Sequence, residues 1–273
     1  YKRQDMPTGC LHLEAGIQSL HENVLMQSRR SGDLQRSLEG LRYLCSLTNM
    51  ETHADLIAGL PLYKLEQIFE DIHVLAHFGA GEIQLESLKV LPGTEMRKRA
   101  EEWGIRYSPY PPYEVLETNE ITAEELQYAR QLSRLLDGYY NTPIWQKITR
   151  QLILSESGFL KSFMNFLIAS DVIDKPLSIE KRGLLLYDFC KQVYPEYTVH
   201  VSVAWIIAGL SLKKAPAEKV MTKHQNPPSA WNILQGKYKD SLKLCRLPHK
   251  TGNYWFGFEL ETQTHVPVFI AEN

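Results

Sequence analysis

Two polar residues, Gln18 and Asp55, stand where apolar runs give way to helical patterns, and both can hold a ligand. A carboxylate accepts hydrogen bonds, and an amide both accepts and donates them. Parallel α/β sheets place their active sites at the carboxyl ends of their strands, so this placement indicates a binding site. Asp55 is the stronger candidate, because a carboxylate in an apolar strand is costly unless it has a partner.

The pattern around these residues predicts alternating strands and helices. Leu34, Leu38 and Leu41 recur at helical spacing, and Asp33 is the expected N-cap of their helix. Strand and helix alternating at these lengths predict parallel βαβ units. Strands are expected over 10–16, 52–58 and 82–88, and helices over 21–27, 33–47, 65–77 and 95–103.

The second half of the chain has a different pattern. Pro109, Pro111 and Pro112 remove backbone donors and mark a boundary segment. Thr122 and Glu125 form a capping-box pattern that opens a predicted helix over 122–140. Helices are predicted over 146–154, 159–169, 179–194 and 229–238, an ambiguous apolar segment over 199–210, and strands over 241–247, 254–259 and 266–271, the last two as a hairpin.

Several motifs occur together and carry a family resemblance. They are Gly16-Ile17-Gln18-Ser19 in the first strand, Arg30 after the next helix, Asp55-Leu56-Ile57-Ala58-Gly59-Leu60-Pro61 in the second strand, and Leu85–Thr94 as the third strand with its loop. In this order they resemble the second half of a radical S-adenosylmethionine (SAM) enzyme barrel, in particular the cobalamin-binding-domain type with an uncharacterised C-terminal domain. The resemblance runs from about residue 9 to residue 141, and more weakly to the end.

The resemblance implies a fold, cofactors and site residues. The implied fold is α/β, the C-terminal half of a parallel partial TIM-like barrel, followed by a mainly helical domain with terminal β-strands. The implied cofactors are SAM, a 4Fe–4S cluster and, as an open question, cobalamin bound by an N-terminal domain outside this chain. By resemblance, Gln18 contacts the methionine part of SAM, Arg30 pairs with its carboxylate, Asp55 faces the ribose hydroxyls and Ile57 packs on the adenine.

The cysteines do not form the cluster loop of that superfamily, Cys-x-x-x-Cys-x-x-Cys. The chain has Cys10, Cys45, Cys190 and Cys245, none close enough to another in sequence. We therefore expect a fragment truncated inside the barrel, with the cluster held by an absent segment, and no cluster or turnover in this chain alone. The alternative is a degenerate relative that has lost its cluster.

Each site residue also has an ordinary structural interpretation. Gln18 could cap the next helix, Arg30 could be solvated, and Ile57 could belong to the core. Glu14 could touch substrate or bond a neighbouring strand, and His53 could be an interior histidine or a proton carrier. No catalytic residue and no metal ligand is assigned.

Composition restricts the functional classes. The chain of 273 residues has 44% hydrophobic residues and a formal net charge of −2, which argues against nucleic-acid binding by bulk charge. Scattered cysteines and the absence of a membrane-length apolar run predict a cytoplasmic protein without membrane contact. The expected partners are an unknown substrate and an electron donor such as flavodoxin or ferredoxin.

The predicted organisation has three parts, and the function has open alternatives. Residues 1–106 are assigned to the barrel half, 107–142 to a linker and closing helix, and 143–273 to an uncharacterised α+β domain. The predicted function is that of a fragment of a radical SAM enzyme, which cleaves SAM reductively to start radical chemistry. The competing classes are a non-catalytic partner-binding module and an ordinary barrel enzyme without a cluster.

Overall fold

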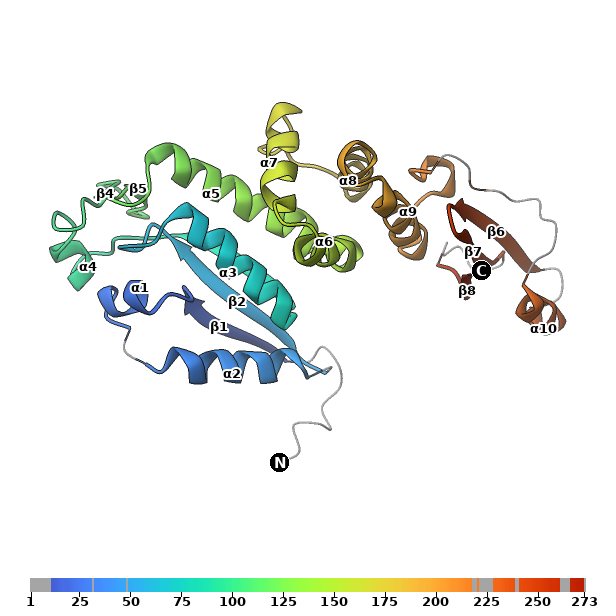
Figure 1. Cartoon of the computed structure of the whole chain (residues 1–273), viewed down its shortest axis with the longest axis horizontal. Helices are drawn as coiled ribbons and strands as arrows, with labels where there is room; N and C mark the ends of the chain where they lie inside the picture. Colours follow the sequence, from blue (N-terminus) through green and yellow to red (C-terminus); the bar gives the residue numbers. More distant parts are fainter. Residues whose placement is uncertain are drawn as a thin grey trace. The chain divides into compact units, whose positions relative to one another are not determined.

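The computed structural model describes residues 11–30, 32–47, 49–217, 220, 228–238, 241–260 and 266–272 (Figure 1). The chain divides into two compact units, Tyr1–Lys175 and Pro176–Asn273. The domain boundaries expected after residues 106 and 142 stay predictions. Among the described residues, no helix combines the length and apolar character needed to cross a membrane.

The first unit is built on a three-stranded parallel sheet with strand order β1-β2-β3. The predicted βαβ alternation is confirmed, and the protein is a mixed α/β structure. Three parallel strands do not by themselves form a barrel, so the barrel stays a prediction. The elements are β1 (His12–Gln18), α1 (Glu22–Gln27), α2 (Leu34–Cys45), β2 (Glu51–Ala58), α3 (Leu65–Phe78) and β3 (Glu82–Ser87).

One face of this sheet is apolar and packs on helices. Alternate residues of β2, including Ala54 and Leu56, are fully buried, and the apolar side of α3 presents Ile68 and Ile72. Both α2 and α3 contact β2, as Figure 1 shows. Every second residue of β2 is buried, and the buried residues of α3 recur at helical spacing. The helices pack on the sheet because each of these apolar faces must be covered from water.

The other face of the sheet is polar, and we call it the polar face. Partner residues in register share a face of a parallel sheet, so the pairs across β1, β2 and β3 define it. Its members are exposed or partly buried. The registered pairs on it are His12↔Glu51, Glu14↔His53, His53↔Glu82, Asp55↔Gln84 and Ile57↔Glu86.

Two predicted element boundaries are wrong in ways that matter. Strand β1 continues to Gln18, two residues beyond the predicted end at residue 16. Strand β2 does end at Ala58, as predicted, and Asp55 therefore lies inside this strand. Helix α4 (Glu95–Lys98) is shorter than the predicted 95–103, because the chain turns after it and returns through Gly104, whose φ is 57°. The expected start of the first strand at Cys10 lies outside the described residues.

Backbone conformation and a close contact explain why the Gly-Leu-Pro segment after β2 begins with glycine. Gly59 has a φ of 89°, a conformation that side chains disfavour. A Cβ there would lie 2.7 Å from Cγ1 of Val115, which approaches from β5 (Val115–Glu117). Strand β5 pairs antiparallel with β4 (Arg106–Tyr107).

The predicted helix over 122–140 is two elements. The capping box is confirmed, since Glu125 N–H donates to Thr122 Oγ1 at 3.2 Å and Thr122 N–H donates to Glu125 Oε2 at 2.8 Å. Helix α5 (Ala123–Leu135) then passes into a π-helical turn, η2 (Leu136–Tyr140). The unit ends with α6 (Pro143–Ser155) and α7 (Phe159–Ala169).

The turn η2 brings Asn141 to the outer edge of β3. Its side chain accepts from Ile83 N–H at 2.9 Å and donates to Ile83 carbonyl at 3.0 Å. Tyr140 donates its hydroxyl to the Ala80 carbonyl at 2.8 Å. Asn141 therefore imitates a neighbouring strand at one residue of β3, which is an edge strand among the described residues.

The second unit combines helices with an antiparallel sheet. The ambiguous segment is helix α9, and the predicted C-terminal strands are confirmed in the order β6-β7-β8. Trp231, Leu244 and Trp255 form a core against this sheet. Residues 261–265, which connect the two strands of the predicted hairpin, lie outside the described residues. The elements are α8 (Ile179–Val193), η3 (Pro195–Tyr197), α9 (Thr198–Ile207), η4 (Leu212–Lys214), α10 (Ser229–Tyr238), β6 (Leu242–His249), β7 (Gly252–Glu259) and β8 (Phe269–Glu272).

Candidate functional site

Arg30 reaches the sheet because helix α1 ends in a Schellman motif. Arg29 N–H donates to Met26 carbonyl at 3.0 Å, and Arg30 N–H donates to Leu25 carbonyl at 2.8 Å. Arg29 takes the left-handed conformation, with a φ of 55°, that glycine usually supplies at this position. The chain then turns back toward β1, where Nη1 of Arg30 donates to the carbonyl oxygen of Gly16.

Gly16 lies between Arg30 and Asp55. A Cβ on Gly16 would lie 3.8 Å from Nη1 of Arg30 and 3.9 Å from Oδ2 of Asp55. Two predicted ligand-binding residues therefore approach the same glycine from different elements. A larger residue at Gly16 would fill the space between them.

Asp55 has an unused acceptor in a partly buried setting. Its Oδ1 is buried and has no hydrogen-bond partner within the described residues. Burial raises the pKa of Asp55 above its ordinary value, Glu14 and Glu86 raise it further, and His53 opposes the shift. A ligand hydroxyl or ammonium group would supply the missing donor and relieve this cost.

Gln18 ends β1 in an irregular conformation. Its φ is 69°, in the left-handed region that residues other than glycine seldom adopt. The register between β1 and β2 also shifts between Ala15 and Gln18. Such backbone irregularity is concentrated at ligand sites, although it does not identify a ligand.

The turn after Gln18 is anchored by Asp71 of α3, which is 1% exposed. Leu20 N–H donates to Asp71 Oδ2 at 2.9 Å, the Tyr63 hydroxyl donates to the same oxygen at 2.5 Å, and Ser19 Oγ lies 3.4 Å from it. One buried carboxylate thus joins the end of β1 to α3 and to the loop after β2. These hydrogen bonds hold the turn at Ser19 and Leu20 in place, and with it the position of Gln18 at the end of β1.

Burial of the Asp71 carboxylate away from water costs free energy. Burial raises its pKa, although hydrogen bonds from Tyr63 and Leu20 counteract the shift. Burial and the neighbouring Asp71 also raise the pKa of Tyr63 far above its usual value, so Tyr63 keeps its proton and remains a donor. His21 is a further polar neighbour of this carboxylate, with its Nε2 3.1 Å from Asp71 Oδ1.

Sequence reasoning missed Asp71 and Tyr63. A signal was present, because Asp71 interrupts the apolar face that Ile68, Ile72 and Leu75 form on α3. A carboxylate at such a position needs partners, and those partners are far away in the sequence. Only the fold identifies them.

Of the four predicted residues, the structure brings two together. Arg30 and Asp55 both approach Gly16, and within the described residues no ion pair joins them. Ile57 lies on the polar face, two residues beyond Asp55 on β2 and in register with Glu86 of β3. Gln18 ends the neighbouring strand, and within the described residues no hydrogen bond joins it to the pair.

The described cysteines do not suit an iron–sulfur cluster. Cys45 lies on α2, Cys190 on α8 and Cys245 on β6, and all three are free. Burial raises the pKa of Cys190 to about 12 and also raises the pKa of Cys245, which disfavours the thiolate that binds iron.

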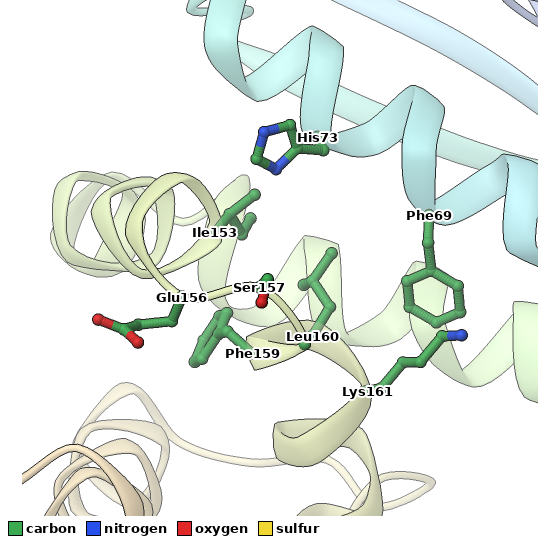
Figure 2. Close-up of a pocket in the computed structure, with 9 residues that line it drawn as sticks. Phe69, His73, Ile153, Glu156, Ser157, Phe159, Leu160 and Lys161 are labelled. Carbon is green, nitrogen blue, oxygen red and sulfur yellow. The ribbon is translucent and has the colours of Figure 1, made fainter.

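A separate small cavity lies between α3 and the junction of α6 with α7 (Figure 2). It has a volume of about 120 Å³, and its lining includes Phe69, His73 and Ile153. Lys161 runs beside the ring of Phe69, with Nζ 5.0 Å from the ring centre. None of the four predicted site residues lines it, and its volume is small for a nucleoside-sized ligand.

Comparison with known families identifies one similar region. Residues 101–204 match a family described as "Protein of unknown function (DUF4080)". The match agrees with an uncharacterised domain in this part of the chain, and it begins before the predicted boundary at residue 143. It does not include β1, β2 or the site around Gly16. No curated protein matches the chain.

Proposed function

We propose that this chain is part of a radical SAM enzyme and that its polar face, at the level of Gly16, binds SAM. The observation that carries the proposal is the approach of Arg30 and Asp55 to Gly16, together with an Asp55 Oδ1 that has no donor within the described residues. A guanidinium and a carboxylate that approach the same glycine suit a zwitterion attached to a ribose. The parallel sheet, with one face covered by helices, is also compatible with part of a barrel wall.

The roles follow from charge and hydrogen-bonding capacity. Arg30 can pair with the methionine carboxylate while it donates to the Gly16 carbonyl, because a guanidinium has five donors. Asp55 can accept from the ribose hydroxyls or from the methionine ammonium. Ile57 supplies an apolar surface on the same face for adenine, and Gln18 adds an amide at the end of β1.

The radical chemistry needs groups from elsewhere. The electron that cleaves the sulfonium bond would come from a 4Fe–4S cluster held by another segment and reduced by a flavodoxin or ferredoxin.

The test is SAM binding in a longer form of the protein that includes a cluster-binding loop, reconstituted without oxygen. Arg30→Ala and Asp55→Asn should each weaken binding by about 1.5–3 kcal/mol, the range for a charge-assisted hydrogen bond. Gly16→Val should abolish binding, because its methyl groups enter the space between the two side chains.

Arg106→Gln is the matched control, since Arg106 is an exposed arginine of β4 that pairs with Glu117 outside the site. Calorimetric titration measures each affinity, and circular dichroism verifies that each variant folds. Equal SAM affinity in the wild type, Arg30→Ala and Asp55→Asn would refute the assignment.

A further inference from the structure

Three potential metal ligands meet where β1 and β2 begin, away from Gln18 at the other end of β1. They are Nδ1 of His12, Oε2 of Glu51 and Nε2 of His53, and all three atoms lie within 4.8 Å of one another. His12 and Glu51 are register partners, and His53 stands two residues after Glu51 on the same strand face. The strand pairing itself therefore brings these side chains together.

The distances fit a common metal ion. His12 Nδ1 lies 3.1 Å from Glu51 Oε2 and 3.5 Å from His53 Nε2. Tetrahedral zinc with ligands at about 2.0–2.1 Å separates its donor atoms by about 3.3 Å. Two imidazoles and one carboxylate are also donors that suit zinc and other divalent transition metals.

Glu82 provides the outer contact that metal-binding histidines usually have. Its Oε2 lies 3.5 Å from Nδ1 of His53, the ring nitrogen turned away from His12. That nitrogen is buried and has no aligned hydrogen bond in the described part of the chain. A small rotation of the ring on metal binding would let it donate to Glu82, which is the carboxylate–histidine–metal arrangement.

We propose that His12, Glu51 and His53 bind one divalent transition-metal ion of the zinc type, with Glu82 orienting His53. Three protein ligands leave a fourth position for water or another ligand. The site is formed by residues different from those of the SAM proposal and goes beyond it. Either can fail without the other.

The test is zinc binding by the untagged full chain without SAM, after the protein has been stripped with a chelator. Zn²⁺ is titrated in competition with a chromophoric chelator, and Co²⁺ is used as a spectroscopic substitute. The wild type should bind one equivalent, and Co²⁺ should give the visible absorption of a four-coordinate site. Prior alkylation removes accessible thiols as competing ligands.

Three variants and one control define the site. His12→Ala and Glu51→Gln should each weaken binding by about 100-fold or more, and Glu82→Gln by roughly 10–100-fold, as for an outer-shell partner. His77→Ala is the control, because His77 is an exposed histidine of α3 outside the cluster, and it should bind as the wild type does.

The results separate the site from an ordinary ion pair between His12 and Glu51. Folding of each variant is checked by circular dichroism, and Glu51→Gln is a nearly isosteric change at an exposed side chain. Absence of a one-equivalent site in the wild type would overturn the proposal. Unchanged affinity in both His12→Ala and Glu51→Gln would also overturn it.

Discussion

Replacement of Asp71 by alanine tests whether one buried carboxylate holds the end of β1 in place. Asp71 is 1% exposed and accepts from Leu20 N–H at 2.9 Å and from the Tyr63 hydroxyl at 2.5 Å. The alanine variant leaves both donors without an acceptor. Each buried unsatisfied donor costs about 1–3 kcal/mol.

The expected loss of stability is smaller than the sum of both penalties. Removal of a desolvated carboxylate recovers part of the cost of burying it, which is visible in the raised pKa of Asp71. We therefore expect Asp71→Ala to lower the free energy of unfolding by about 2–4 kcal/mol. Tyr63→Phe removes one donor and leaves the carboxylate its other partners, so its loss should be about 1–2 kcal/mol.

Urea denaturation followed by circular dichroism measures these losses, and hydrogen exchange of the Leu20 amide localises them. Glu66→Ala is the matched control on the same helix, because Glu66 is an exposed residue whose ion pair with Lys161, at 3.8 Å, should be worth less than about 1 kcal/mol. A loss below about 1 kcal/mol for Asp71→Ala, or unchanged exchange at Leu20, would refute the anchor.

Two further predictions concern the same unit. Because the pKa of Asp71 is raised in the folded state, its stabilising effect is greatest at low pH and declines as pH rises through the folded pKa. The wild type should therefore gain stability relative to Asp71→Asn as pH falls from 7 toward about 4, measured by urea denaturation at each pH; a constant difference would contradict this. Asn141→Ala removes both side-chain hydrogen bonds to Ile83, so we expect a loss of about 2–4 kcal/mol, faster exchange of the Ile83 amide and more association through the open edge. Native-like exchange at Ile83 would show that Asn141 does not protect the edge.

Much of the local structure could be predicted because its signals are local. The caps at Asp33 and Thr122 depend on residues three positions apart, and both are confirmed. The parallel strands follow from apolar segments separated by helices. The π-helical turn after Leu135 was missed, since its residues continue a helical pattern and its geometry depends on contact with β3.

The candidate site was only partly predictable. The strand containing Asp55 was predicted with its correct end at Ala58, but the pairing of Asp55 with Gln84 depends on the register between β2 and β3. The approach of Arg30 to Gly16, near Asp55, requires the left-handed turn at Arg29, which no local preference for arginine indicates.

The sequence by itself determined the alternation of strands and helices, the covered face of the sheet and the residues available for chemistry. Only the tertiary structure decided which of those residues meet. Asp71 with Tyr63, and His12 with Glu51 and His53, come together through strand register and helix packing. Such contacts join residues far apart in the chain, and hydrophobic periodicity specifies which face a residue occupies but not which distant residue lies beside it.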